Sequence, residues 1–228
     1  MRTPGADREL ALGFLYAEGI ITGMDDIGRA GHCGRPGTPE FGNTVDVLPS
    51  PGSALDPDTI RAGRRGTLTS SACGVCGREQ VDDLLTRCRP LVGAKRLERE
   101  IIFQAQDQML NAQPLFAETG GVHAAAVFSE GGDMLACYED VGRHNAVDKS
   151  VGDLLLQDGI LGKESQLLAV SSRASFEIVQ KAAIARIPTV VAVSAASSLA
   201  ITLAKEVGIT LVGFSRKDRM VVYAGELA

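Results

Sequence analysis

The chain lacks tryptophan, and only 4% of its 228 residues are aromatic. A surface that binds single-stranded nucleic acid by stacking its bases on aromatic rings is therefore not expected. The net charge of -5 also argues against a general nucleic-acid-binding protein. No apolar run is long enough to cross a membrane, and residues 1–7 contain no apolar signal-peptide core. The sequence predicts a globular protein with no nucleic-acid partner and no membrane segment.

Cysteine is also sparse, with five residues in a chain that shows no export signal. We therefore expect the protein to work in the reducing cytoplasm, where a close cysteine pair is more often catalytic or metal-binding than structural. One such pair, Cys73 and Cys76, is separated by two residues and flanked by glycines. Two thiols at this spacing can hold a metal, cycle a disulfide or carry sulfur.

The surroundings of this pair distinguish these chemistries in part. A structural zinc site usually takes four ligands, but Cys33, Cys88 and Cys137 are scattered and supply no second close pair, so we expect no metal. The thioredoxin motif normally follows an early strand of a βαβ unit and lacks the flanking glycines. Accessible sulfurs beside Arg78 are typical of nucleophilic thiolates. Zinc binding and redox cycling remain as alternatives.

The first part of the chain predicts a small α+β region. We expect a helix over residues 7–18, with Asp7 as its N-cap and Gly19 after its end, and a Gly- and Pro-rich loop over 31–43. The other expected elements are short strands at 44–48 and from 67, and helices at 79–86 and 97–111.

After the break at Gly120-Gly121 the chain predicts an α/β core. Strands are expected at 122–128, 134–138, 167–170, 189–193, 209–212 and 220–223, and helices at 147–155, 175–186 and 197–207. The strand at 134–138 is expected to form a hairpin with 122–128, and the strand at 220–223 to return antiparallel. Alternating strands and helices imply right-handed crossovers and a largely parallel C-terminal sheet. We divide the chain into an N-terminal part, 1–95, which carries the cysteine pair, and a core, 96–228.

The loops after the parallel strands are candidate binding residues, because ligands of such sheets bind outside the carboxyl ends of the strands. Hydroxyls, free N–H groups and guanidinium groups suit a phosphate, and an aromatic ring suits a base. A solvated turn is the simpler alternative. The chain has no Walker-type or Gly-x-Gly-x-x-Gly motif, so an ATPase or a dinucleotide dehydrogenase is not supported. The candidate residues are Ser172, Arg173, Phe214, Ser215, Arg216, Lys217, Asp218 and Arg219.

Two histidine motifs precede these loops. His123 begins a His-x-Ala run that invites comparison with the His-x-Glu signature of zinc deaminases, but Ala125 replaces the glutamate that shuttles protons. In the second motif His144 and Asp148 lie four residues apart on one helix face, and Arg143 with the helix N-terminus favours an anion. A core histidine and a locally paired helix start are the simpler interpretations.

Six stretches, taken together, resemble one known family. They are Thr3-Pro4-Gly5 with Ala11-Leu12-Gly13-Phe14 and Glu18-Gly19-Ile20-Ile21; Ser70-Ser71-Ala72-Cys73-Gly74-Val75-Cys76-Gly77; Thr119-Gly120-Gly121-Val122-His123-Ala124-Ala125; Glu139-Asp140-Val141-Gly142-Arg143-His144-Asn145-Ala146-Val147-Asp148-Lys149; Ser171-Ser172-Arg173; and Gly213-Phe214-Ser215-Arg216. They run in family order over nearly the whole chain. The chain resembles the FdhD family, the formate dehydrogenase accessory sulfurtransferases.

The resemblance implies a fold and an assembly. It implies a cytidine deaminase-like three-layer sandwich without deaminase activity, and a homodimer. Family members usually carry a further N-terminal segment before the position of Met1, so the first sheet is expected to be incomplete.

The resemblance also implies a function. Such a protein takes persulfide sulfur from a cysteine desulfurase and passes it to the molybdenum (or tungsten) bis-guanine-dinucleotide cofactor before formate dehydrogenase receives it. Cys73 would carry the persulfide, Cys76 would assist, and Phe214 to Arg219 would contact the cofactor. The alternative is a non-catalytic chaperone that binds the molybdenum cofactor.

Overall fold

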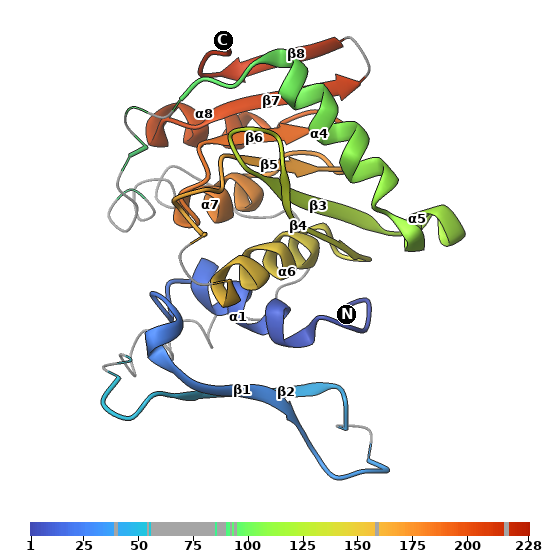
Figure 1. The fold of residues 1–228 in the computed structure, drawn as a ribbon, viewed down its shortest axis with the longest axis vertical. Coiled ribbons are helices and arrows are strands. Elements are labelled where there is room, and N and C mark those ends of the chain that lie inside the picture. Colours follow the sequence, from blue (N-terminus) through green and yellow to red (C-terminus); the bar gives the residue numbers. More distant parts are fainter. Residues whose placement is uncertain are drawn as a thin grey trace.

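The computed structural model describes residues 1–38, 41–53, 55, 85, 90–91, 93, 95–157, 160–216 and 219–228. Its main body is a six-stranded sheet in the order β4-β3-β5-β6-β7-β8, with helices on both faces (Figure 1). The strands are β3 (His123–Phe128), β4 (Met134–Asp140), β5 (Leu167–Val170), β6 (Thr189–Ala192), β7 (Thr210–Arg216) and β8 (Arg219–Ala224). The strands predicted for this core are therefore all present, with boundaries shifted by a few residues.

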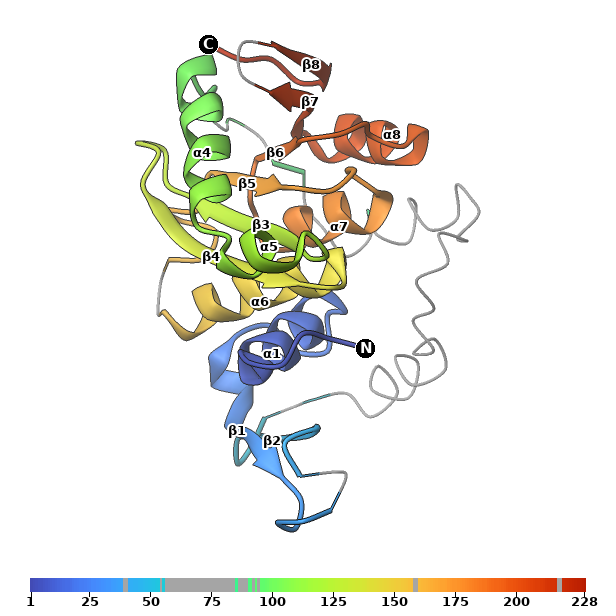
Figure 2. The same ribbon diagram turned by 90° about the vertical axis from the view of Figure 1, so that its right-hand side faces the viewer.

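Helices on the two faces of the sheet produce three layers (Figure 2). One face is covered by α4 (Arg99–Asn111), which is followed by the short α5 (Pro114–Thr119). The other is covered by α6 (Arg143–Leu156), α7 (Phe176–Ile184) and α8 (Ser198–Val207). Alternate residues of β3 serve the two layers: Ala124 and Phe128 pack with α4, whereas Ala125 and Val127 join the larger core under α6 to α8.

The prediction of a largely parallel C-terminal sheet holds for β5 to β7 alone, and the six-stranded sheet as a whole is mixed. Only the β5–β6 and β6–β7 pairs are parallel, whereas β3–β4, β3–β5 and β7–β8 are antiparallel. The alternating segment from residue 167 to 212 does form the expected parallel unit. The sheet becomes mixed because a tight turn at residues 129–133 makes β3 and β4 a hairpin, and a second tight connection returns β8 beside β7.

The N-terminal region forms a helix and a hairpin below the main body (Figure 1). Its elements are α1 (Asp7–Ala17), the 3-10 turn η1 (Met24–Asp26), β1 (Ile27–Cys33) and β2 (Thr44–Pro49). The β1–β2 pair is antiparallel, so the expected loop over 31–43 begins three residues later than predicted. The expected strand from 67 and the helix at 79–86 lie outside the described residues, apart from residue 85.

Asp7 is not the N-cap of α1, contrary to the expectation from the sequence. Ala6 occupies that position, with a φ of 52°, and supplies no side-chain cap. The Asp7 carboxylate instead binds the guanidinium of Arg2, with one N–O distance of 2.9 Å. A charged partner outcompetes the backbone amides for this carboxylate.

Helices α1 and α6 cross at two glycines that allow their backbones to touch. A Cβ atom on Gly13 would lie 1.9 Å from the carbonyl oxygen of Asp148, and one on Gly152 would lie 1.8 Å from that of Glu9. Because no larger residue fits at either position, the crossing fixes α1 against the helix that follows β4.

Candidate functional site

Polar loops collect at the edge of the sheet where the parallel strands end, which is the edge that faces the viewer in Figure 2. The first residue of β3 and the last of β4 lie there too, because His123 is paired with Asp140. This edge holds a cavity of about 650 Å³ between α4, α5 and the ends of β5 to β7. Its described lining consists of Gln106, Asp107, Met109, Leu110, Gln113, Phe116, Gly120, Gly121, Val122, His123, Ser171, Val193, Ser215 and Arg216.

Two buried polar atoms of this lining have no hydrogen-bond partner in the part of the chain that the structure describes. They are Nε2 of Gln106 and Oγ of Ser215, whose residues are 9% and 1% exposed. An unsatisfied buried polar group costs about 1–3 kcal/mol. By contrast, Gln113 donates to the carbonyl of Met109 at 2.8 Å and is satisfied. The unmet groups indicate that the cavity is built for a polar ligand.

The end of β7 carries Arg216, which lines this cavity, and Phe214, which is not among the described lining residues. Phe214 has a φ of 51°, a left-handed conformation that is costly outside glycine, and its ring is 48% exposed. A register shift between Gly213 and Arg216 accompanies this turn of the backbone. Arg216 is paired across the hairpin with Arg219. Arg216 is exposed and lines the cavity, where a guanidinium group can bind an anion.

The other predicted binding residues lie at different places. Ser172 is buried, and its hydroxyl donates to the carbonyl of Arg173 at 3.0 Å. Arg173 is exposed. Neither Ser172 nor Arg173 is among the described residues that line the cavity, whereas their neighbour Ser171 is. The Ser171 hydroxyl accepts from the N–H of Ala124 at 2.9 Å, which ties β5 to β3. Lys217 and Asp218 lie outside the described residues.

The sequence analysis missed Gln106, which contributes to the cavity from α4. A signal was present, because Gln106 and Gln113 interrupt an otherwise apolar buried stripe with Ile102, Ala105 and Met109. A glutamine within such a stripe needs a partner inside the protein or a ligand.

The histidines of the two sequence motifs, His123 and His144, line different cavities. His123 lines the large cavity, and burial, with help from the Arg143 guanidinium, lowers its pKa. His144 lies at a second cavity of about 280 Å³, between α1, α6 and α7. Burial, and then the positive charge of Arg143, lowers the pKa of His144 to about 4, against an opposing effect of Glu177.

The His144 side chain lies close to two polar residues at the start of α7. His144 Nε2 lies 3.3 Å from the Ser175 hydroxyl and 3.8 Å from a carboxylate oxygen of Glu177. Burial raises the pKa of Glu177, but hydrogen bonds from Ser175 and its own N–H prevail and lower it. Ser175 occupies the predicted N-cap position of α7 without making a side-chain cap. Because its pKa is lowered, the Glu177 carboxylate is ionised at neutral pH and places a negative charge in the first turn of α7.

Asp148 forms part of the same cavity and is paired with Lys181. Their contact is 2.6 Å long, and both side chains are nearly inaccessible. Burial raises the pKa of Asp148, and Lys181 opposes this effect. His144 and Asp148 do share one face of α6, as predicted from their spacing, and both line the cavity.

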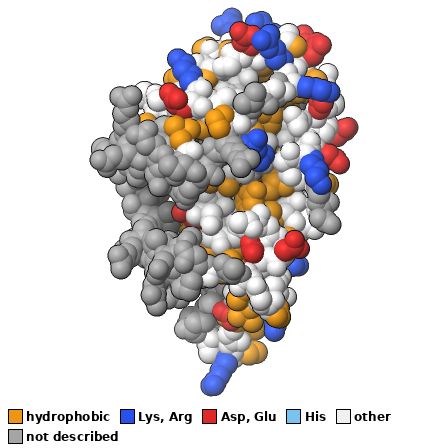
Figure 3. Space-filling model, turned by 90° about the vertical axis from the view of Figure 1, so that its left-hand side faces the viewer, with side chains coloured by type: hydrophobic (Ala, Val, Ile, Leu, Met, Phe, Trp, Pro, Cys, Tyr) orange, Lys and Arg blue, Asp and Glu red, His pale blue; other side chains and the backbone are white. Residues whose placement is uncertain are grey.

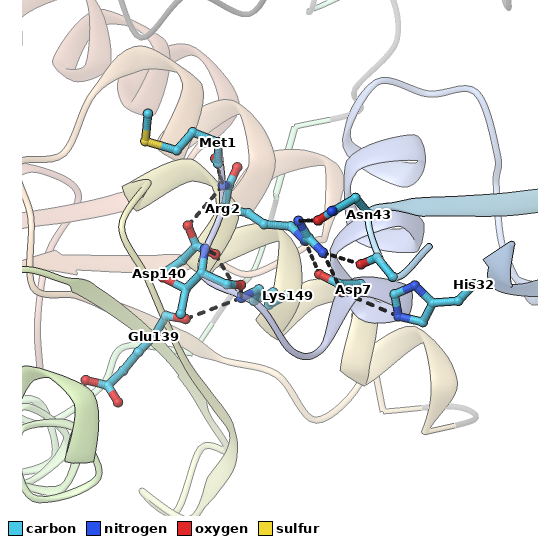
Figure 4. A network of polar contacts seen from close by, with 11 residues as sticks. Met1, Arg2, Asp7, His32, Asn43, Glu139, Asp140 and Lys149 are labelled. Carbon is cyan, nitrogen blue, oxygen red and sulfur yellow. Dashed lines mark hydrogen bonds and ion pairs between the residues drawn. The ribbon is translucent and has the colours of Figure 1, made fainter. Parts of the chain in front are cut away.

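The first residues of the chain are fastened beside this edge by a polar network (Figure 4). Lys149 and Asp140, both buried, form an ion pair of 2.8 Å. Lys149 also donates to the carbonyl of Thr3 at 2.8 Å, and the N–H of Thr3 donates to Asp140 at 3.0 Å. Met1 consequently lines the smaller cavity together with His144.

The cysteines predicted to act, Cys73 and Cys76, lie outside the described residues. Cys33 and Cys137 are described and are free thiols. Burial, and then the charge of Glu139, raises the pKa of Cys137 to about 11, so it is a thiol at neutral pH. Among the described residues there is no cluster of three metal-ligating side chains and no helix long and apolar enough to span a membrane.

The opposite edge of the molecule has a different character (Figure 3). Acidic and basic side chains are interspersed along it, with hydrophobic side chains between them. Lys95 is paired with Glu130 at 2.9 Å, and Arg96 is paired with Glu226. Among the described residues of this edge, these cations are therefore paired locally with carboxylates.

Comparisons with known proteins bear on the family of this chain. Proteins named sulfur carrier protein FdhD are 50% identical in Anaeromyxobacter dehalogenans, over 98% of this chain and 80% of that protein, and 45% identical in Mycobacterium tuberculosis, over 98% and 82%. A crystal structure of a protein from Desulfotalea psychrophila, described as a putative formate dehydrogenase accessory protein, superposes with a TM-score of 0.73. It is 26% identical, and the match covers 99% of this chain and 80% of that one. Residues 1–227 match the model of the FdhD/NarQ family, and the chain belongs to this family.

Proposed function

We propose that this protein is a sulfurtransferase of the reducing cytoplasm that serves formate dehydrogenase. It takes sulfur from a cysteine desulfurase as a persulfide on Cys73 and delivers it to a molybdenum or tungsten bis-guanine-dinucleotide cofactor bound at the carboxyl edge of the sheet. The observation that carries the acceptor half is the 650 Å³ cavity, where Ser215 and Arg216 meet His123 and Ser171. The names of the relatives support the sulfur-carrying half.

The edge has the properties that a large anionic cofactor needs. Arg216 lines the cavity at the end of β7 and offers a guanidinium group to phosphates. The exposed ring of Phe214 is suited to stack on a base. Val122, Met109 and Val193 supply apolar walls that exclude water from a planar group.

The sulfur chemistry proceeds by thiol exchange. The Cys73 thiolate attacks the outer sulfur of the desulfurase persulfide, and the desulfurase thiolate leaves. The Cys76 thiolate then attacks the inner sulfur of the Cys73 persulfide, which expels the outer sulfur as hydrosulfide for the acceptor metal and leaves a Cys73–Cys76 disulfide. A thiol reductant returns both residues to thiols before the next cycle.

Sulfur loading tests the donor half. After incubation with a cysteine desulfurase and cysteine, intact mass should rise by one sulfur atom in the wild type and in Cys76→Ala, but not in Cys73→Ala. The matched control is Cys137→Ala, which should load normally because burial keeps that residue a thiol. Equal loading of Cys73→Ala would show that another residue carries the sulfur.

Maturation of formate dehydrogenase separates this proposal from the chaperone alternative. We expect the Cys73→Ala, Cys76→Ala double variant to bind the cofactor but to yield inactive formate dehydrogenase. If maturation survives in that double variant, the protein is a non-catalytic carrier of the cofactor.

A further inference from the structure

One wall of the large cavity is a helix that is exposed along its whole length. Residues 114–121, which comprise α5 and the two glycines after it, are all exposed, and α5 contains no buried residue. The helix projects from the end of α4 (Figure 1). The segment nevertheless forms much of the cavity wall, since Gln113, Phe116, Gly120 and Gly121 belong to the described lining. A wall that buries so little surface can move at a small cost in free energy.

A single carboxylate ties this segment to the sheet. Glu139, near the end of β4, accepts the N–H of Leu115 at 2.9 Å on one oxygen and the N–H of Phe116 at 2.7 Å on the other. Both hydrogen bonds are strengthened by the charge of the carboxylate. In the described part of the chain, every other hydrogen bond of residues 114–121 stays within the segment 113–121. Among the described residues, Glu139 is therefore the polar tether between α5 and the sheet.

The two ends of the segment are suited to act as hinges. At the first end Gln113 is buried and donates to the Met109 carbonyl at 2.8 Å, which anchors the chain to α4. Pro114 then begins α5 and has no N–H with which to continue the preceding helix. At the second end Gly120 has a φ of 62°, and Gly121 follows it before β3 begins. Because glycine tolerates large backbone rotations, α5 can swing while α4 and β3 stay in place.

We propose that α5 is a lid over the large cavity and that Glu139 is the positioning residue that latches it. The inference rests on the proposed function and adds how its acceptor site opens and closes. With both hydrogen bonds to Glu139 made, Phe116 closes the cavity and water is excluded from a bound ligand. When these bonds break, α5 swings outward, and a large ligand enters or leaves.

The rates of ligand binding test the lid. Stopped-flow fluorescence with N-methylanthraniloyl-GDP as the probe measures association with the full chain and dissociation from it. Glu139→Gln removes the charge and one of the two acceptor oxygens, so both rate constants should rise about fivefold to tenfold, while the dissociation constant changes less than about threefold. Gly121→Ala should slow both steps because alanine stiffens the hinge. An added Cβ fits there, since its nearest neighbours are two oxygen atoms of Thr119 at 3.8 Å.

A matched control and thermal unfolding distinguish a lid from a merely structural contact. Glu130→Gln removes the same charge from an exposed carboxylate that is paired with Lys95 at 2.9 Å, and it should leave both rate constants unchanged. Because α5 contains no buried residue, Glu139→Gln should unfold close to the wild-type temperature. A lower unfolding temperature with unchanged rate constants would assign Glu139 a structural role only and overturn the proposal.

Hydrogen exchange of the ligand-free protein provides a readout that needs no ligand. The amides of Leu115 and Phe116 should exchange faster than those of Ile102 and Ala105 in α4, and about tenfold faster again in Glu139→Gln. Exchange as slow as that of α4 in both proteins would show that α5 does not open.

The outcomes separate the lid from the proposed function. If the probe binds but neither Glu139→Gln nor Gly121→Ala changes its rate constants, the acceptor site stands and the lid is wrong. If the probe does not bind, the acceptor half of the proposed function fails, and hydrogen exchange still decides whether α5 opens. Sulfur loading of Cys73 is measured independently in either case.

Discussion

His144 illustrates how burial sets the charge of a single residue. Its side chain is 30% exposed at the smaller cavity, and its surroundings combine the guanidinium of Arg143 with the carboxylate of Glu177. Burial is the larger influence, so the imidazole is neutral at neutral pH despite the nearby carboxylate. It can therefore accept a hydrogen bond from Ser175 or a ligand without introducing a further positive charge.

This lowered pKa makes stability depend on pH. Between pH 6.5 and about 4 the unfolded chain binds a proton at His144 that the folded chain does not, so stability is complete above pH 6.5 and declines as the pH falls toward 4. The loss should reach about 2 kcal/mol, after allowance for the partial exposure of the ring. Urea unfolding at several pH values should show this slope in the wild type and a smaller one in His144→Gln.

An NMR titration of the His144 ring checks the cause directly. Titration close to pH 6.5 in the folded protein would contradict the burial argument, even if a slope in stability were found. Titration near pH 4 with no difference in slope between wild type and His144→Gln would assign the pH dependence to another group.

Sequence reasoning identified residue types better than their orientation. It predicted Ser215 and Arg216 as binding residues, and both line the large cavity. It did not predict that Ser172 turns inward to the carbonyl of Arg173, because the direction of a serine hydroxyl depends on local backbone geometry. It also missed Gln106, since a cavity between α4 and the sheet depends on tertiary packing.

Among the elements, the contact between α1 and α6 is the most tightly constrained. Glycine occurs at both contact points, and a Cβ atom added at Gly13 or Gly152 would overlap backbone atoms of the opposite helix. Backbone atoms cannot move aside as a flexible side chain can, so the two helices must separate if either residue is enlarged. The contact therefore links the N-terminal region to the helix that carries His144 and Asp148.

Gly152→Ala should destabilise the protein by about 1–3 kcal/mol, although alanine is the better helix former. The matched control is Gly31→Ala on β1, where an added Cβ meets nothing within 4 Å. Guanidinium chloride unfolding of the two variants measures the difference. An unchanged or increased stability of Gly152→Ala would mean that the helices are not in backbone contact.

The elements of the core were more predictable than those of the N-terminal region. Alternating buried strands and amphipathic helices define residues 167–207 by pattern alone. Ser197, predicted as the first residue of the helix, is instead the N-cap of α8 and accepts from the N–H of Ala200 at 3.2 Å. The last three residues of β1 were predicted as loop and residues 27–30 were assigned no element, because Gly28 and Gly31 weaken the strand pattern. The direction of β4 and β8 followed from short connections, but their place in a mixed sheet depended on the whole fold.

At the scale of the whole molecule, the two edges of the sheet differ in how their charges are used. At the opposite edge Arg96 and Lys95 are each paired with a carboxylate. At the carboxyl edge Arg216 is exposed and lines a cavity with unmet hydrogen-bonding groups. This asymmetry predicts that anionic ligands bind at one edge only.

Arg216→Ala should weaken GDP binding about tenfold and make the remaining binding less sensitive to salt, because a charge-assisted contact to phosphate is lost. Arg96→Ala, at the opposite edge, removes one arginine with the same change in net charge and should leave the affinity unchanged. Titrations at two salt concentrations measure both effects. Equal weakening by the two variants would indicate that overall charge, not the carboxyl edge, attracts the nucleotide.

The exposed ring of Phe214 also has a practical consequence. Because the chain contains no tryptophan, Phe214→Trp would create a protein with a single indole fluorophore, one residue along the chain from Ser215 in the large cavity. An aromatic residue already occupies the left-handed backbone at this position. Its emission would then respond to a base stacking on it, and binding could be followed optically without any label on the ligand.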